Sequence, residues 1–105
     1  MPIIAGAGRY TGTETRYTEQ LRTATLSVGT YCLPVGGVDR QSPHTEDEIY
    51  VVTAGQATFV EKEDRVQVGP GDTLFVAAGD EHRFVDITED FAVVVVFAPP
   101  EGSNA

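Results

Sequence analysis

The chain has 105 residues, of which 41% are hydrophobic, and its 16 acidic and 7 basic side chains give a net charge of −9 at pH 7. This length is typical of one compact domain, which needs no disulfide bond, in keeping with the single cysteine. The acidic charge repels phosphate backbones and anionic lipids, so we expect no binding to nucleic acid or to a membrane surface.

No segment has the features of a targeting or membrane-spanning sequence. The N-terminus lacks the basic start and the apolar stretch of a signal peptide. The longest apolar run, residues 91–98, is far shorter than the roughly 20 residues that span a bilayer. We therefore expect a soluble, cytoplasmic protein.

Taken in chain order, the sequence predicts an N-terminal arm, a β-barrel and a short tail. Residues 1–23 show no helical periodicity and are expected to form the arm, residues 24–98 the single domain, and residues 99–105 the tail. The domain alternates short β-branched and aromatic stretches with Gly, Pro and acidic turns. The expected strands are Ala24–Leu33, Glu48–Thr53, Ala57–Glu61, Arg65–Val68, Thr73–Ala77, His82–Ile87 and Phe91–Ala98. This pattern is typical of an all-β sandwich or barrel.

Two of the expected strands are apolar on both faces. In the strand that begins at Glu48, period-two geometry places Glu48, Tyr50 and Val52 on one side, with apolar residues on the other. The stretch Phe91–Phe97 has the same character. Because an uncovered strand of this kind tends to aggregate, we expect a homodimer that covers it.

The two histidines, His44 and His82, each lie near a turn. Glu48 follows His44 by four positions, and strand alternation places both side chains on one face, so they can point into one cavity. Imidazole and carboxylate together suit Zn, Fe, Mn, Ni or Cu, and His82 would complete two histidines and one carboxylate with open coordination positions. The alternatives are a polar strand-end residue for His44, a solvated carboxylate for Glu48 and a turn cap for His82.

These residues and their spacing resemble the two motifs of the cupin family. The first motif has a glycine, two histidines, a glutamate and a second glycine, and its counterparts here are Gly36, Ser42, His44, Glu48 and Gly55. The second has a glycine, a proline, another glycine, a histidine and an asparagine, and its counterparts are Gly71, Ala77, Gly79, His82 and Asp86. The resemblance covers about residues 26–97 and implies a double-stranded β-helix, a jelly-roll barrel. It also implies one divalent metal, held by His44, Glu48 and His82.

One departure from the family pattern concerns the metal site. Ser42 stands where the first metal-binding histidine would be, which leaves a fourth ligand position open. Gln41 could supply an amide oxygen if Pro43 introduces a bulge that shifts the register, whereas under strict alternation Gln41 points away. The fourth position is therefore assigned to Gln41 or Ser42, or to neither.

Three aromatic residues are candidates for the cavity wall, with ordinary core as the alternative. Tyr50 shares its phase with Glu48, Phe75 with Ala77 and Phe84 with His82. Cys32 is expected to be a small buried hydrophobe. Ser42 lacks a second base, which argues against a hydrolase triad.

The resemblance implies a metal-binding cupin, an enzyme acting on a small oxygenated metabolite with dioxygenase, isomerase or lyase chemistry. The alternative is a non-catalytic cupin that binds a small molecule or serves as an accessory protein, with a degenerate metal site. The fold does not choose between them, and the residues do not distinguish Fe, Mn, Zn, Ni and Cu.

Overall fold

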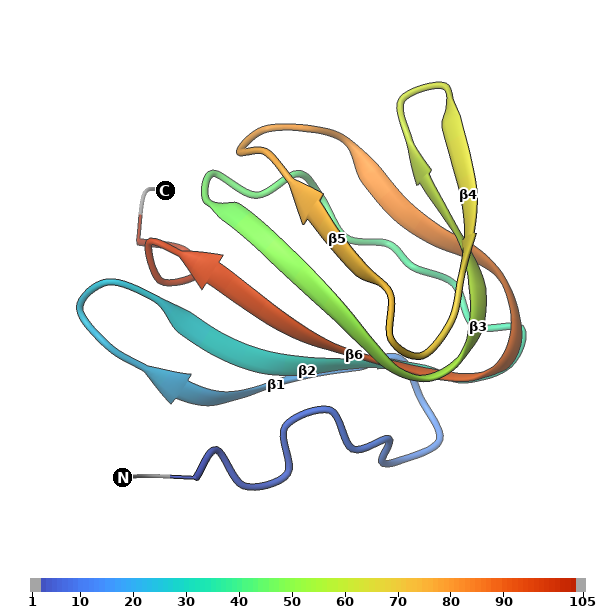
Figure 1. Cartoon of the computed structure of the whole chain (residues 1–105), viewed down its shortest axis with the longest axis horizontal. Coiled ribbons are helices and arrows are strands. Elements are labelled where there is room, and N and C mark those ends of the chain that lie inside the picture. The colour runs from blue at the N-terminus through green and yellow to red at the C-terminus, as the bar shows by residue number, and fades with distance from the viewer. Residues whose placement is uncertain (1–2, 104–105) are drawn as a thin grey trace.

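The computed structural model describes residues 3–103, and this part of the chain forms six β-strands and no helix. The strands are β1 (Arg16–Arg22), β2 (Ser27–Leu33), β3 (Asp47–Glu61), β4 (Asp64–Val68), β5 (Thr73–Val76) and β6 (His82–Ala98). They pair antiparallel in the order β1, β2, β6, β3, β4, with β5 also paired to β3. The sheet curls around a common interior (Figure 1), which confirms the predicted all-β barrel. Among the described residues, no helix is long and apolar enough to cross a membrane.

The two longest strands join segments that the sequence predicts to be separate. Breaks were expected at residues 54–56 and 88–90, but β3 and β6 run through both positions. The two strands pair with each other from the first residue of β3 to the last, with register shifts between Val52 and Thr58. This long, bulged ladder is the central strand pairing of the barrel.

Gly55 shows why β3 bends there instead of ending. Its φ of 83° lies in the left-handed region, and a Cβ atom at this position would lie 2.3 Å from the carbonyl oxygen of Asp90 on β6. Glycine permits both the conformation and the close approach of the two backbones. A turn signal in the sequence is therefore a bulge in the structure.

β1 lies inside the stretch that was expected to be a loose arm, so this part of the prediction was wrong. It pairs with β2, and the ring of Tyr17 packs over Gly29, where a Cβ would lie 2.1 Å from the Tyr17 hydroxyl. With only Tyr17 and Leu21 apolar, β1 carries a weak sequence signal. β1 can pack against β2 in this way because Gly29 has no side chain under the Tyr17 ring.

The N-terminal segment before β1 covers part of the outer face of the sheet. Gly8 donates its N–H to Thr30 Oγ1 at 2.9 Å and accepts a hydrogen bond from Thr53 Oγ1 at 2.6 Å. The Cys32 thiol lies 3.7 Å from the carbonyl oxygen of Arg9, and Cys32 is buried as expected. This segment thus provides some of the cover that the apolar outer face requires.

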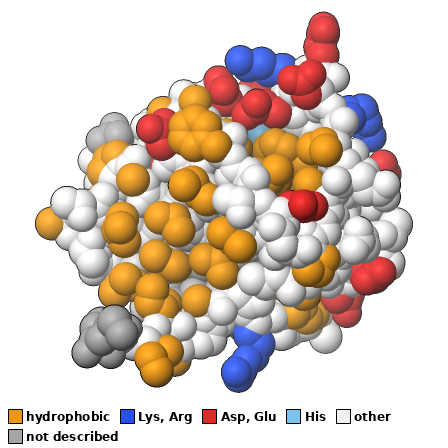
Figure 2. All heavy atoms as spheres, in the orientation of Figure 1, with side chains coloured by type: hydrophobic (Ala, Val, Ile, Leu, Met, Phe, Trp, Pro, Cys, Tyr) orange, Lys and Arg blue, Asp and Glu red, His pale blue; other side chains and the backbone are white. Residues whose placement is uncertain are grey.

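Phe75 does not line the interior, contrary to the sequence prediction. β5 pairs Phe75 with Ile49 and Val76 with Glu48, so Val76 shares the inward phase of Glu48. Phase was counted back from Ala77, but β5 ends at Val76, and alternation does not extend past a strand end. Phe75 is 62% exposed and Ile49 40%. Figure 2 shows that hydrophobic side chains gather on the face of the molecule turned toward the viewer.

Candidate metal centre and its cavity

The segment between β2 and β3 carries Gln41 and His44 across the opening of the barrel. Residues 37–44 have no regular secondary structure, and the buried carboxylate of Asp39 fixes their course. Asp39 accepts hydrogen bonds from the Tyr31 hydroxyl at 2.7 Å and from the Phe84 N–H at 2.9 Å. It also accepts from the Gln41 N–H at 3.2 Å and from Gln41 Nε2 at 2.8 Å. A single carboxylate therefore ties this segment to β2 and β6.

Glu48 near the start of β3 and His82 at the start of β6 meet inside the barrel. Their side chains are each 1% exposed, and His82 Nε2 lies 2.8 Å from Glu48 Oε1. His82 Nδ1 donates to the carbonyl oxygen of Asp80 at 2.9 Å. Burial lowers the pKa of His82, but the Glu48 carboxylate and the Asp80 carbonyl outweigh it, so that the pKa lies above its usual 6.5.

Tyr50 joins this pair to Gln41. Its hydroxyl lies 2.9 Å from His82 Nε2 and donates to Gln41 Oε1 at 3.1 Å. Burial, together with the nearby Glu48 charge, raises the pKa of Tyr50 far above its usual value, so the hydroxyl keeps its proton at physiological pH. Polar groups thus run without interruption from Asp39 to Glu48.

The Glu48 carboxylate has no aligned hydrogen-bond donor among the described residues, although both of its oxygens are buried. Its short contact with His82 is an ion pair without hydrogen-bond alignment. A buried polar group left in this state is costly, and a bound cation satisfies it. Carboxylate and imidazole are the ligands that divalent transition metals prefer. The donor set therefore fits a divalent metal.

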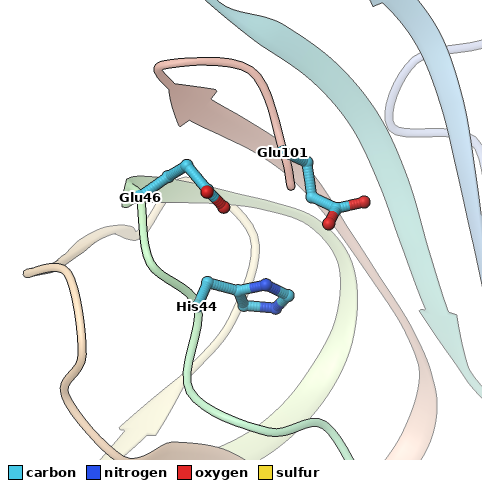
Figure 3. Close-up of side chains that lie close together, drawn as sticks. All are labelled: His44, Glu46 and Glu101. Atoms are coloured by element: carbon cyan, nitrogen blue, oxygen red, sulfur yellow. The ribbon is translucent and has the colours of Figure 1, made fainter. Parts of the chain in front are cut away.

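His44 lies near this pair but groups with two other carboxylates. Its ring centroid is 6.5 Å from that of His82 and 4.7 Å from that of Phe97. Ligand atoms of His44, Glu46 and Glu101 all lie within 4.8 Å of one another, and Figure 3 shows the three side chains facing a common space. We call Glu48 and His82 the inner pair, and His44, Glu46 and Glu101 the outer group.

Sequence reasoning missed Glu46 and Glu101. Glu46 belongs to neither motif and was not singled out, yet it is buried. Glu101 lies in the expected tail, where its N–H donates to Ser27 Oγ at 2.9 Å and its carbonyl accepts from Arg22 Nη2 at 2.7 Å. No motif contains Glu101, and its side chain comes near His44 only when the chain has folded.

Of the two candidates for the open fourth position, Gln41 enters the site and Ser42 is exposed to solvent. The alternation that would turn Gln41 away does not apply, because residues 37–44 are not a strand. Here the side chain is directed by its hydrogen bond to Asp39. The bulge at Pro43 is not needed to explain it.

A cavity of about 920 Å³ opens beside these residues, large enough for a small metabolite. Tyr17, Tyr31, Phe97 and Val95 contribute aromatic and apolar wall, and Tyr50 lies at its inner end beside His82. The polar lining includes Gln41, His44, Arg40 and Glu101. Of the three predicted wall residues, Tyr50 alone is in this lining, since Phe84 packs beneath it with ring centroids 5.0 Å apart and Phe75 lies outside.

Comparisons with other sequences identify the family and several relatives of this chain. Residues 29–98 match the profile of the family described as a cupin domain. An uncharacterized protein of Streptomyces coelicolor is 44% identical over 85 residues, which are 81% of this chain and 81% of that protein. The acireductone dioxygenase of Geobacillus thermodenitrificans is 37% identical over 67 residues, which are 56% of this chain and 37% of that enzyme.

Comparison with solved structures finds the same fold in other proteins. An uncharacterized conserved protein with a double-stranded β-helix domain, from Klebsiella pneumoniae, superposes with a TM-score of 0.77 at 20% identity. The superposition covers 94% of this chain and 89% of the other. This likeness shows the fold and confirms the double-stranded β-helix expected from the two motifs.

Proposed function

Because the chain belongs to the cupin domain family, we propose that it is a metal-dependent enzyme acting on a small oxygenated metabolite. The metal would be held by Glu48 and His82, with His44 as the third ligand. The observation that carries this proposal is the Glu48 carboxylate, fully buried and without an aligned donor beside His82. Burying a carboxylate is costly, and a cation bound beside His82 would offset this cost with a stronger interaction than the ion pair alone.

A divalent metal would supply Lewis-acid polarisation of a substrate oxygen at this position. The chain contributes the surroundings in which such polarisation is effective. The aromatic walls of the cavity restrict water, and the Arg40 guanidinium in its lining offers a bidentate partner for a carboxylate or enolate oxygen. Tyr50 keeps its proton and can turn its hydroxyl toward a ligand oxygen next to His82.

The kind of substrate is supported by the cavity and by one relative. About 920 Å³ with a few convergent polar groups suits a small polar metabolite. The partial similarity to an acireductone dioxygenase, which spans just over a third of that enzyme, favours chemistry on an oxygen-rich small molecule. Dioxygenase, isomerase and lyase chemistry remain the classes of reaction to be tested.

Metal analysis tests the proposal. Protein purified without added metal is expected to contain close to one divalent metal per chain, and metal binding should raise its Tm. Glu48→Gln and His82→Ala should abolish both effects, because each removes a ligand of the inner pair.

A double variant of the outer group, Glu46→Gln with Glu101→Gln, is the matched control and should keep its metal. If this control loses the metal while Glu48→Gln keeps it, the ion belongs to the outer group and the proposed ligand set is wrong. His44→Ala should lower affinity in either case, because His44 belongs to both arrangements.

The alternative is a non-catalytic cupin that binds a small molecule. It is favoured by Ser42, which replaces the first motif histidine and is exposed. In that case the cavity would bind ligands, and the Glu48 and His82 variants would bind them equally well. Turnover that is lost together with metal in those two variants would exclude this alternative.

A further inference from the structure

The orientation of the Gln41 amide is determined by its partner. The Asp39 carboxylate can only accept hydrogen bonds, and it receives Gln41 Nε2 at 2.8 Å on the oxygen that also receives the Phe84 N–H. The nitrogen end of the amide must therefore face Asp39. The carbonyl oxygen faces the other way, where it accepts the Tyr50 hydroxyl at 3.1 Å.

This amide oxygen belongs to the same group of polar atoms as the inner pair. The hydroxyl that it accepts lies 2.9 Å from His82 Nε2, which in turn lies 2.8 Å from Glu48 Oε1. Gln41 also lines the cavity. In the chain it immediately precedes Ser42, the counterpart of the absent first histidine. Gln41 thus directs a neutral oxygen toward the centre that lacks a fourth ligand.

We propose that Gln41 supplies this amide oxygen as the fourth protein ligand of the metal, and that Asp39 is the positioning residue that keeps the oxygen turned inward. The inference rests on the proposed function, since it concerns the same metal. It goes further because it assigns the ligand that the motif lacks and gives a role to Asp39, a position that neither motif specifies. Asp39 acts only through Gln41.

The proposal has a consequence for metal preference. Imidazole nitrogens favour Zn, Ni and Cu, whereas carboxylate and carbonyl oxygens favour Mn and other hard cations. An amide oxygen in place of a third imidazole makes the set of ligands harder. We therefore expect the wild-type protein to discriminate less strongly in favour of Ni²⁺ over Mn²⁺ than a variant that carries a histidine at position 41.

Titration of the metal-free protein with Mn²⁺, Ni²⁺ and Co²⁺ tests the role of Gln41. Gln41→Leu should weaken Mn²⁺ binding by about tenfold or more and change the visible absorption spectrum of bound Co²⁺. Gln41→His should tighten Ni²⁺ binding relative to Mn²⁺. Ser42→His is the matched control, because it adds an imidazole at the adjacent exposed position, and it should leave affinities and spectrum unchanged.

A double-mutant cycle tests the role of Asp39. Asp39→Asn should weaken Mn²⁺ binding by about tenfold or more, because the amide of Gln41 is then free to turn. In the Gln41→Leu background the same change should have no further effect on affinity, since the residue that it positions is gone. If Asp39 served only the fold, the two losses would add, and the assignment of Asp39 would be wrong.

The outcomes separate this inference from the proposed function. If Glu48→Gln and His82→Ala abolish metal binding while Gln41→Leu binds Mn²⁺ and Co²⁺ like the wild type, the metal centre stands and Gln41 is not a ligand. If Ser42→His acts as Gln41→His was expected to, Ser42 holds the fourth position. If Glu48→Gln and His82→Ala both bind metal normally, the proposed function itself fails.

Discussion

Three tyrosines, Tyr17, Tyr31 and Tyr50, line one cavity, and their hydroxyl groups differ in hydrogen bonding. The Tyr31 hydroxyl donates to Asp39, and the Tyr50 hydroxyl donates to Gln41. The Tyr17 hydroxyl is buried with no hydrogen-bond partner in the described part of the chain. Burial raises the pKa of Tyr17, so its hydroxyl keeps its proton and is a donor without an acceptor among the described residues.

This difference predicts opposite outcomes for two otherwise identical changes. Tyr31→Phe should lower the free energy of unfolding by about 1.5–3 kcal/mol, because it removes a hydrogen bond to a buried carboxylate. Tyr17→Phe removes a donor that pairs with nothing and should leave the free energy of unfolding unchanged or raise it. Urea denaturation of the two variants measures both effects. Equal losses would mean that Tyr17 has a partner in solution.

At the scale of elements, the sequence predicted side-chain orientation correctly within regular strands. It failed in the loop between β2 and β3, where hydrogen bonds between side chains determine the orientation. The inward phase of Glu48, Tyr50 and Val52 was correct, since these residues lie in unbroken β-structure. Gln41 could not be placed in this way, because a hydrogen bond to Asp39 orients it. Glu101 could not be placed at all, because nothing local marks its contact with His44.

Substitutions at Gly55, in the bulge of β3, and at Gly71, in a turn, should differ in their cost to stability. Gly55→Ala and Gly71→Ala both place a side chain at positive φ, which costs roughly 1–2 kcal/mol. At Gly71 a Cβ meets nothing within 4 Å, whereas at Gly55 it meets the Asp90 carbonyl oxygen, which adds about 1–3 kcal/mol of strain. Gly55→Ala should therefore have the lower Tm by thermal denaturation. Equal Tm values would show that β3 and β6 can separate at the bulge without loss.

At the scale of the whole molecule, the outer face of the sheet is covered only in part. The N-terminal segment packs at Thr30 and Thr53, while Ile49 and Phe75 remain exposed. The expected homodimer stays a prediction. The exposed side chains of Ile49 and Phe75 indicate where its interface would lie. A second copy that buried these side chains would complete the cover that the segment begins.

Light scattering of Phe75→Ser tests this location. The wild-type protein is expected to have the mass of a dimer at micromolar concentration, and Phe75→Ser that of a monomer. Val66→Ser is the control, since Val66 is half-exposed on β4, a strand that does not pair with β5. A wild-type protein with the mass of a monomer would contradict the predicted homodimer.

The ladder between β3 and β6 also sets the order in which the site can form. Glu48 is opposite Phe97, and Glu61 is opposite His82, so each pair of strand residues closes a loop of the intervening chain. Such non-local pairing slows folding, because the entropy of loop closure is lost before the contacts form. β6, which carries His82, is synthesised after the other five described strands, so the Glu48 carboxylate has no ion-pair partner until β6 has emerged from the ribosome. The inner pair is therefore among the last features of the barrel to assemble during synthesis.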